Sequence, residues 1–163
     1  MTESSKKITW QDPSEGAAKA LTMSGLDYLR AMANGEVPMA PISALMNMTA
    51  LRAEPGEMFM EAQPDTSQYN PIGSVHGGFY ATLLDSVCGC AIQTTLPLGQ
   101  AYTSLEIKVS FLRQINADTG TVYAHGWVTK PGSKAAFAEG DLRDGAGKLL
   151  ATASSACLVF PIG

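Results

Sequence analysis

The segment from Phe79 to Ile92 constrains the fold of this chain most, because almost every side chain in it is apolar or small. It lies within a longer segment, residues 76–95, that is predicted to form a helix and to end before Pro97. A helix that is apolar nearly all round must be covered on most of its sides. We therefore expect the rest of the chain to fold around this helix.

The sequence after this helix has the alternation of apolar and polar residues that is typical of strands. In residues 103–111 one face is expected to carry Leu105, Ile107, Val109 and Phe111, and the other Ser104, Glu106, Lys108 and Ser110. Further strands are expected at 120–129, 135–143 and 148–160, with a glycine-containing hairpin turn at 144–147. This pattern predicts an α+β fold in which a curved antiparallel sheet wraps around the apolar helix.

The N-terminal part of the chain predicts fewer regular elements. Residues 1–14 are expected to be disordered. Residues 15–35 have apolar side chains at helical spacing and are expected to form one helix, which Ser14 caps and Gly35 ends.

Two short strands are expected between this helix and the apolar one, at 42–53 and 57–63, joined by a turn that contains Pro55 and Gly56. We accordingly expect an N-terminal tail and helix, residues 1–40, followed by one domain, residues 41–163.

The composition argues against several classes of function. The net charge is −4 and no basic cluster is present, so neither a nucleic acid nor an anionic membrane is an expected partner. No apolar run reaches the roughly 18 residues of a membrane span, and the polar N-terminus lacks the apolar core of a signal peptide, so a cytoplasmic protein is expected. Only 16% of the residues are charged. The resulting apolar surface indicates a homodimer or homotetramer.

The cysteines and histidines do not predict a metal site. Cys88 and Cys90 point about 200° apart on a helix and cannot bridge, and Cys157 is remote in sequence. All three are expected to be small buried residues. Only two histidines, His76 and His125, are present, which is too few for a cluster with cysteine. We expect neither a metal nor an organic cofactor.

The loop Asn70–Gly78 leads into the start of the apolar helix. Gly77 and Gly78 let a ligand approach the backbone closely, because no Cβ stands in the way. Unpaired N–H groups in the first turn of a helix stabilise negative charge, including a developing oxyanion. Asp85 lies two turns further along, too far to reach this helix start in its own chain. A second chain could bring its Asp85 there.

Asp85 has two alternative interpretations. A lone carboxylate among apolar neighbours is costly to desolvate unless another group holds it. Asp85 is therefore either a catalytic residue or a structural residue that bonds to a neighbour such as Thr82, one turn earlier. The residues expected only to pack or to line a pocket are His125, Met39, Met46 and Met48.

The pattern Asn-x-x-Gly-x-x-His-Gly-Gly, followed by Asp85 on an apolar helix and by four strands, resembles the hotdog-fold acyl-CoA thioesterases. Within them it is most similar to the PaaI-like (phenylacetate-pathway) branch. The resemblance covers about residues 40–160 and leaves the N-terminal helix as an addition. It implies a curved antiparallel sheet around the central helix, and a dimer whose active sites lie at the interface.

The resemblance also implies a role for each residue of the motif. Gly77 would donate its N–H to the thioester carbonyl oxygen, and Asp85 of the partner chain would be the nucleophile or general base. Asn70 would position substrate or water, and His76 would brace the loop or contact the thioester. The residues implied in substrate binding are Gly78, Ser104, Lys130, Ser133 and Lys134, with Ser104 orienting water and the last three lying in a turn at the CoA phosphates.

The sequence thus predicts an acyl-CoA thioesterase that hydrolyses a CoA thioester to the free acid and CoA. The alternative is a non-catalytic acyl-CoA-binding protein that senses its ligand, because one fold can serve both functions. The presence of Asp85 favours the enzyme. Aromatic, short and long acyl groups all remain open at this point.

Overall fold

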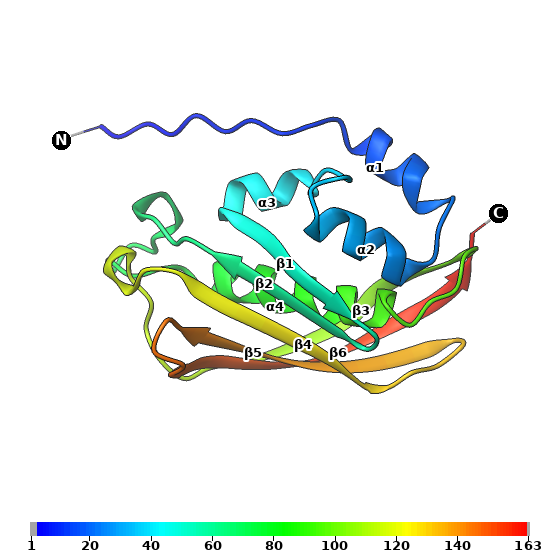
Figure 1. Ribbon diagram of the computed structural model, residues 1–163. Helices are drawn as coiled ribbons and strands as arrows, with labels where there is room; N and C mark the ends of the chain where they lie inside the picture. The colour runs from blue at the N-terminus through cyan, green and yellow to red at the C-terminus, as the bar shows by residue number, and fades with distance from the viewer. Residues whose placement is uncertain (1–2, 163) are drawn as a thin grey trace.

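A six-stranded antiparallel sheet wraps around one long helix in the computed structural model, which describes residues 3–162 (Figure 1). The α-helices are α1 (Pro13–Ala20), α2 (Gly25–Ala33), α3 (Pro41–Met46) and α4 (Gly77–Gln93). The strands are β1 (Met48–Glu54), β2 (Glu57–Ala62), β3 (Gln100–Phe111), β4 (Val122–Lys130), β5 (Ala135–Asp144) and β6 (Leu149–Pro161). Two 3₁₀ turns, η1 (Thr66–Gln68) and η2 (Ala117–Thr119), lie in the connections.

The sheet has the strand order β1-β2-β4-β5-β6-β3, so β1 and β3 are its two edges. Helix α4 contacts all six strands. Nine residues of α4 are buried: Phe79, Tyr80, Leu83, Leu84, Val87, Cys88, Gly89, Ala91 and Ile92. The predicted apolar helix, the strands that follow it and the α+β architecture are confirmed. No helix within residues 3–162 is both long and apolar enough to cross a bilayer.

Strand β3 departs from the alternation that its sequence predicts. Ser104 pairs with Cys157 and Glu106 with Ala156, so Leu105 is an extra residue in a β-bulge and is 63% exposed. A bulge reverses which face the neighbouring side chains occupy. Ser104 therefore faces α4 and not the outer face on which it was expected.

The predicted N-terminal helix is in fact two helices. Ser24 accepts a hydrogen bond from the Asp27 N–H and starts α2 afresh. A Cβ on Gly25 would fall 1.9 Å from the Gln93 carbonyl oxygen, so this glycine lets α2 pack closely on the end of α4. The start of α1 also differs from the prediction, because Asp12 rather than Ser14 is the N-cap.

The strand predicted at 42–53 is half wrong. Its first residues form α3, which has Pro41 in its first turn, where the missing N–H costs nothing. Asn47 ends α3 in the left-handed conformation, with φ of 49°, and β1 begins at Met48.

The residues before α1 are extended, where disorder was expected. Residues 3–12 form neither helix nor strand and run along α3 (Figure 1). The Lys6 ammonium donates to Asp65 Oδ2 at 2.7 Å and to Asn47 Oδ1 at 3.0 Å. Met1 and Thr2, which belong to the same prediction, lie outside the described residues.

Gly126 marks the closest approach of the sheet to α4, and its replacement by alanine is expected to be strongly destabilising. A Cβ there would lie 2.3 Å from the Val87 carbonyl oxygen, which is fixed within the helix backbone. We expect Gly126→Ala to lower the free energy of unfolding by about 3 kcal/mol, measured by urea denaturation. Gly145→Ala is the control, because nothing lies within 4 Å of its Cβ position. Equal stability of the two variants would contradict the close approach.

Candidate active site

The loop before α4 is held together by the side chain of Asn70. Its amide oxygen accepts hydrogen bonds from the backbone N–H groups of Ile72 and Ser74, and its amide nitrogen donates to Ser74 Oγ at 2.9 Å. The Asn70 N–H also donates to the Ser74 carbonyl. These contacts all lie within the loop, so Asn70 shapes the chain that leads to the helix start.

His76 is the N-cap of α4. Its Nδ1 accepts a hydrogen bond from the Gly78 N–H at 2.8 Å. Because Nδ1 is the acceptor, the ring proton of the neutral imidazole lies on Nε2. The exposed ring therefore offers an N–H donor at the helix start.

The two glycines at this helix start have different surroundings. A Cβ on Gly78 would lie 3.0 Å from Nδ1 of His76, so the absence of a side chain leaves room for the cap. A Cβ on Gly77 would lie 3.1 Å from the Phe111 ring. Among residues 3–162 the Gly77 N–H has no hydrogen-bond acceptor, whereas the Gly78 N–H is bonded to His76. The free donor is thus the one on Gly77.

Asp85 is half-buried, and Ser104 holds its carboxylate. Ser104 Oγ donates to Asp85 Oδ1 at 2.8 Å, across from β3 to α4. The alternative partner, Thr82, bonds instead to the Gly78 carbonyl. The bulge at Leu105 makes the contact with Ser104 possible, because it turns Ser104 toward the helix.

Asp85 and Gly77 lie on the same flank of α4, which faces the edge strand β3. Gly77 adjoins Phe111 near the end of β3, and Asp85 adjoins Ser104 earlier in the same strand. Eight residues of helix separate the two groups by about 12 Å. One chain therefore holds both groups, but too far apart to act on one carbonyl.

The three cysteines are free thiols and are poor nucleophiles. Burial, with a smaller effect from the Asp85 charge, raises the pKa of Cys88 to about 12. Burial likewise raises the pKa of Cys90 to about 12 and, by less, the pKa of Cys157. Thiols with such pKa values stay protonated at neutral pH, and the thiol is not the reactive form. Cys88 and Cys157 are buried as expected, whereas Cys90 is only partly buried.

The predicted CoA-binding turn lies far from the helix start within one chain. Lys130 ends β4, and Ser133 and Lys134 are exposed in the connection to β5. Nearby in β4, the Val128 N–H bonds to the Gly56 carbonyl, and Gly56 in turn bonds to Thr94, the C-cap of α4. The turn is therefore near the end of α4, and the structure does not bring it to Gly77.

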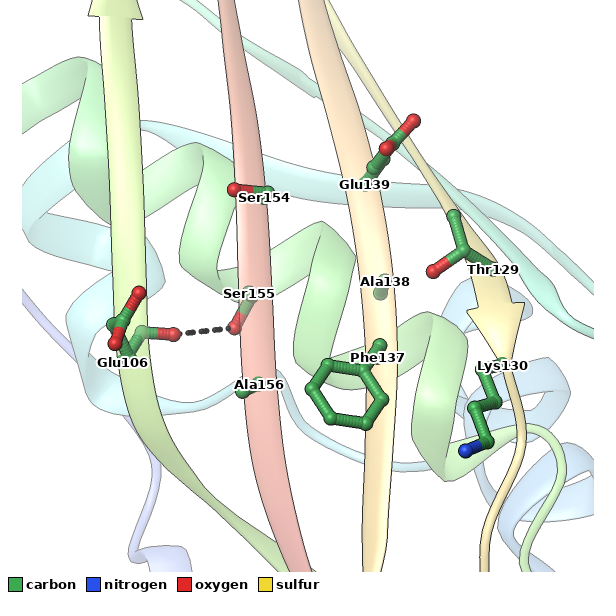
Figure 2. Close-up of a pocket in the computed structure, with 9 residues that line it drawn as sticks. All are labelled: Glu106, Thr129, Lys130, Phe137, Ala138, Glu139, Ser154, Ser155 and Ala156. Atoms are coloured by element: carbon green, nitrogen blue, oxygen red, sulfur yellow. Dashed lines mark hydrogen bonds between the residues drawn. The ribbon is translucent and has the colours of Figure 1, made fainter.

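A hollow of about 470 Å³ on the outer face of the sheet includes Lys130, with α4 behind the strands (Figure 2). Glu106 and Glu139 also line it. Two carboxylates disfavour an anionic ligand such as a CoA phosphate, so this hollow is not a convincing phosphate site. His125 is also remote from the helix start, in β4, where it stacks on Phe59 and contacts Glu57.

A groove of about 380 Å³ opens beside the helix start. Its lining comes from four parts of the chain: Lys6 and Ile8, Leu45 and Met46, Ser67 and Gln68, and His76, Gly78 and Phe79. Of the methionines expected to line a pocket, Met46 does so here. The sequence indicated nothing about Ile8 or Leu45, because neither stands in a motif.

Asn70→Ala is expected to lower turnover by about tenfold, because the loop that presents Gly77 loses the two hydrogen bonds that the Asn70 amide oxygen accepts and the one that its amide nitrogen donates. Asn70→Asp keeps the acceptors and should recover part of the loss. Steady-state rates of the purified variants measure both effects. A larger loss for Asn70→Ala than for Asp85→Asn would show that Asn70 has the leading chemical role.

Comparisons with known proteins agree with one another. A family model described as the thioesterase superfamily matches residues 72–151. Human acyl-coenzyme A thioesterase 13 is 32% identical over 109 residues, which make up 66% of this chain and 76% of the human protein.

Solved structures with the same fold include a phenylacetic acid degradation-related protein from Ralstonia eutropha. Its TM-score is 0.72 at 26% identity, and the match covers 80% of this chain and 98% of that chain. A Streptococcus mutans protein bound to acetyl-CoA has a TM-score of 0.65 at 20% identity, over 71% of this chain and 90% of that chain.

Proposed function

The chain belongs to the thioesterase superfamily and is a thioester hydrolase, and from that premise we propose that it hydrolyses acyl-CoA to the free acid and CoA in sites shared by two copies of the chain. The observation that carries the proposal is the arrangement along α4. A free N–H on Gly77 and a carboxylate held by Ser104 both lie on the flank beside the open edge of the sheet.

Strand β3 supports pairing with a second copy. It is an edge strand of 12 residues, and a long unpaired edge is a ready template for another strand. Exposed apolar side chains lie along it and just after it, including Leu105, Phe111 and Leu112. Burial of these side chains against a second copy would remove a liability of the monomer.

The positions along β3 support a two-fold arrangement that completes the site. Along β3, Phe111 lies beside Gly77 of α4, and Ser104 lies beside Asp85 of α4. An antiparallel partner strand related by a two-fold axis between these two positions, near Ile107, would bring Ser104 of the second copy opposite Phe111 of the first. Asp85 of that copy would then approach the first copy's Gly77, and the same would hold in reverse.

In the proposed reaction the thioester carbonyl oxygen accepts a hydrogen bond from the Gly77 N–H, at the positive end of the α4 dipole. Asp85 either attacks the carbonyl carbon or deprotonates a water that does so, and Ser104 orients its carboxylate. The tetrahedral intermediate collapses with cleavage of the C–S bond. CoA leaves as a thiolate. If water was the nucleophile, the acid is formed directly, and the proton that Asp85 took up passes to the thiolate. If Asp85 attacked, water then hydrolyses the anhydride between Asp85 and the acyl group, which regenerates the carboxylate, and a proton of that water ends on the CoA thiol.

The remaining predicted residues take supporting roles in the proposal. His76 holds the start of α4 and presents Nε2–H beside the thioester. Gly78 leaves room for His76, and Asn70 shapes the loop. The antiparallel arrangement would also bring the partner's turn with Lys130, Ser133 and Lys134 nearer to this helix start, where its lysines would meet the CoA phosphates.

Release of free CoA from a panel of acyl-CoA thioesters, followed with a thiol reagent, tests the proposed function. We expect turnover of at least one of acetyl-, octanoyl-, palmitoyl- and phenylacetyl-CoA. Saturable binding of these thioesters with no release of thiol would contradict it and would identify a ligand-sensing protein instead.

A further inference from the structure

Most of the residues that line the groove beside the helix start, including all those of one wall, precede the residues matched by the family model. Lys6 and Ile8 come from the N-terminal segment 3–12, called here the N-terminal arm, whereas the family match begins at residue 72. The rest of the lining comes from α3, from η1 and from the start of α4. The arm runs along α3 (Figure 1). Without the arm the groove would be open on that side.

Lys6 fixes the arm beside the groove. Its ammonium binds both Asp65 Oδ2 and Asn47 Oδ1, and Asn47 itself donates to Asp65 at 2.8 Å. Burial alone would raise the pKa of Asp65, but hydrogen bonds from Lys6, Ser67 and Asn47 outweigh it and hold this pKa well below its usual range. The carboxylate is therefore charged at neutral pH and holds the arm against the end of α3 and the start of η1.

The lining of the groove suits the acyl part of a thioester and not its nucleotide part. Ile8, Leu45, Met46 and Phe79 make most of its wall apolar. Its volume of about 380 Å³ lies in the range of small-ligand sites. His76 and Gly78, which also line the groove, adjoin the proposed position of the carbonyl. An acetyl group would leave most of this space empty, whereas a straight acyl chain would occupy it.

We propose that the N-terminal arm forms one wall of the acyl-binding groove, and that Ile8, held in place by the contact of Lys6 with Asp65, determines the length of acyl chain that the enzyme prefers. This inference rests on the proposed function. The groove is expected to select straight apolar acyl groups of medium length, such as octanoyl, over acetyl. Each further buried CH₂ favours binding by about fourfold, so the preference grows with chain length until the groove is full.

The test is the ratio of kcat/KM for octanoyl-CoA to that for acetyl-CoA, measured with the full chain. We expect a wild-type ratio of at least about tenfold. Ile8→Trp fills the groove and should reduce the ratio about tenfold, whereas Ile8→Ala lengthens the groove and should move the optimum to a longer chain. Opposite shifts from one position would not result from general damage to the fold.

The contact of Lys6 with Asp65 has a matched control in the neighbouring lysine. Lys6→Ala and Lys7→Ala remove the same charge, but only Lys6 bonds to Asp65 and Asn47. We expect Lys6→Ala to reduce the octanoyl preference and Lys7→Ala to leave it at the wild-type value. Thermal unfolding of each variant checks that the domain remains folded.

The possible failures are distinguishable. If the wild type releases CoA, and Ile8→Trp, Ile8→Ala and Lys6→Ala all show its chain-length profile, the role of the arm is wrong. The proposed function would still stand. Absence of CoA release from every thioester by the wild type would overturn the proposed function and this inference with it.

Discussion

Asp85→Asn is expected to reduce turnover by at least about 100-fold, because an amide can neither attack a thioester nor accept a proton from water. The fold should be unaffected. An asparagine oxygen can still accept the hydrogen bond that Ser104 donates to Asp85 at 2.8 Å. Steady-state rates and thermal unfolding of the purified variant measure the two effects separately.

Ser104→Ala provides the comparison for this variant. It leaves the carboxylate in place and removes only the hydroxyl that orients it, so its loss of turnover should be smaller, about tenfold. An Asp85→Asn enzyme that retained a third of the wild-type rate would show that another group is the nucleophile or base. The protonated thiols of Cys88 and Cys90 do not offer one.

Gly77→Pro is expected to cause a loss of similar size, about 100-fold or more in kcat, because it deletes the N–H that is proposed to hold the developing oxyanion. The backbone is suited to this substitution. Gly77 is the first residue of α4, where proline is favoured. His76 has φ of −64° and ψ of 144°, the extended conformation that a residue before proline prefers.

Gly77→Ala is the matched control, because it adds the same Cβ and keeps the N–H. Its Cβ would press on Phe111, but that ring is 57% exposed and has room to move. We expect Gly77→Ala to keep most of the activity. If the proline and alanine variants lose the same amount of activity, the added side chain and not the missing N–H is the cause, and this N–H does not hold the oxyanion.

The part of the fold that was predictable is the part with long apolar or alternating segments. Helix α4 and the strands after it have apolar patterns long enough to indicate their type, and the structure confirms them. The N-terminal half was harder, because Ser24 and Gly25 interrupt an otherwise helical spacing. The reason for Gly25 is its close approach to Gln93, a tertiary contact that no local pattern indicates.

The motif residues were identifiable, but their contacts were not. The sequence places Asp85 on the apolar helix, whereas its hydrogen bond to Ser104 depends on the bulge at Leu105. The position of a bulge cannot be recognised from the alternation of apolar and polar residues. Continued without a bulge, the alternation of β3 places Ser104 on the outer face, whereas the bulge turns it toward α4. The groove wall at Ile8 was not predictable either, since it depends on the hydrogen bond from Lys6 to Asp65, which is 59 residues away in the sequence.

Mixing of two inactive variants tests the shared site most directly. Chains with Asp85→Asn keep the Gly77 N–H, and chains with Gly77→Pro keep the carboxylate. In a mixed dimer of the proposed geometry one site contains both lesions and the other contains neither. Random exchange of subunits should then restore about a quarter of the wild-type rate, since half of the dimers are mixed and each has one intact site of two. Mass spectrometry of the mixed dimers confirms the exchange. Confirmed exchange without recovered activity would contradict the shared site, because Gly77 and Asp85 would then have to act from the same chain.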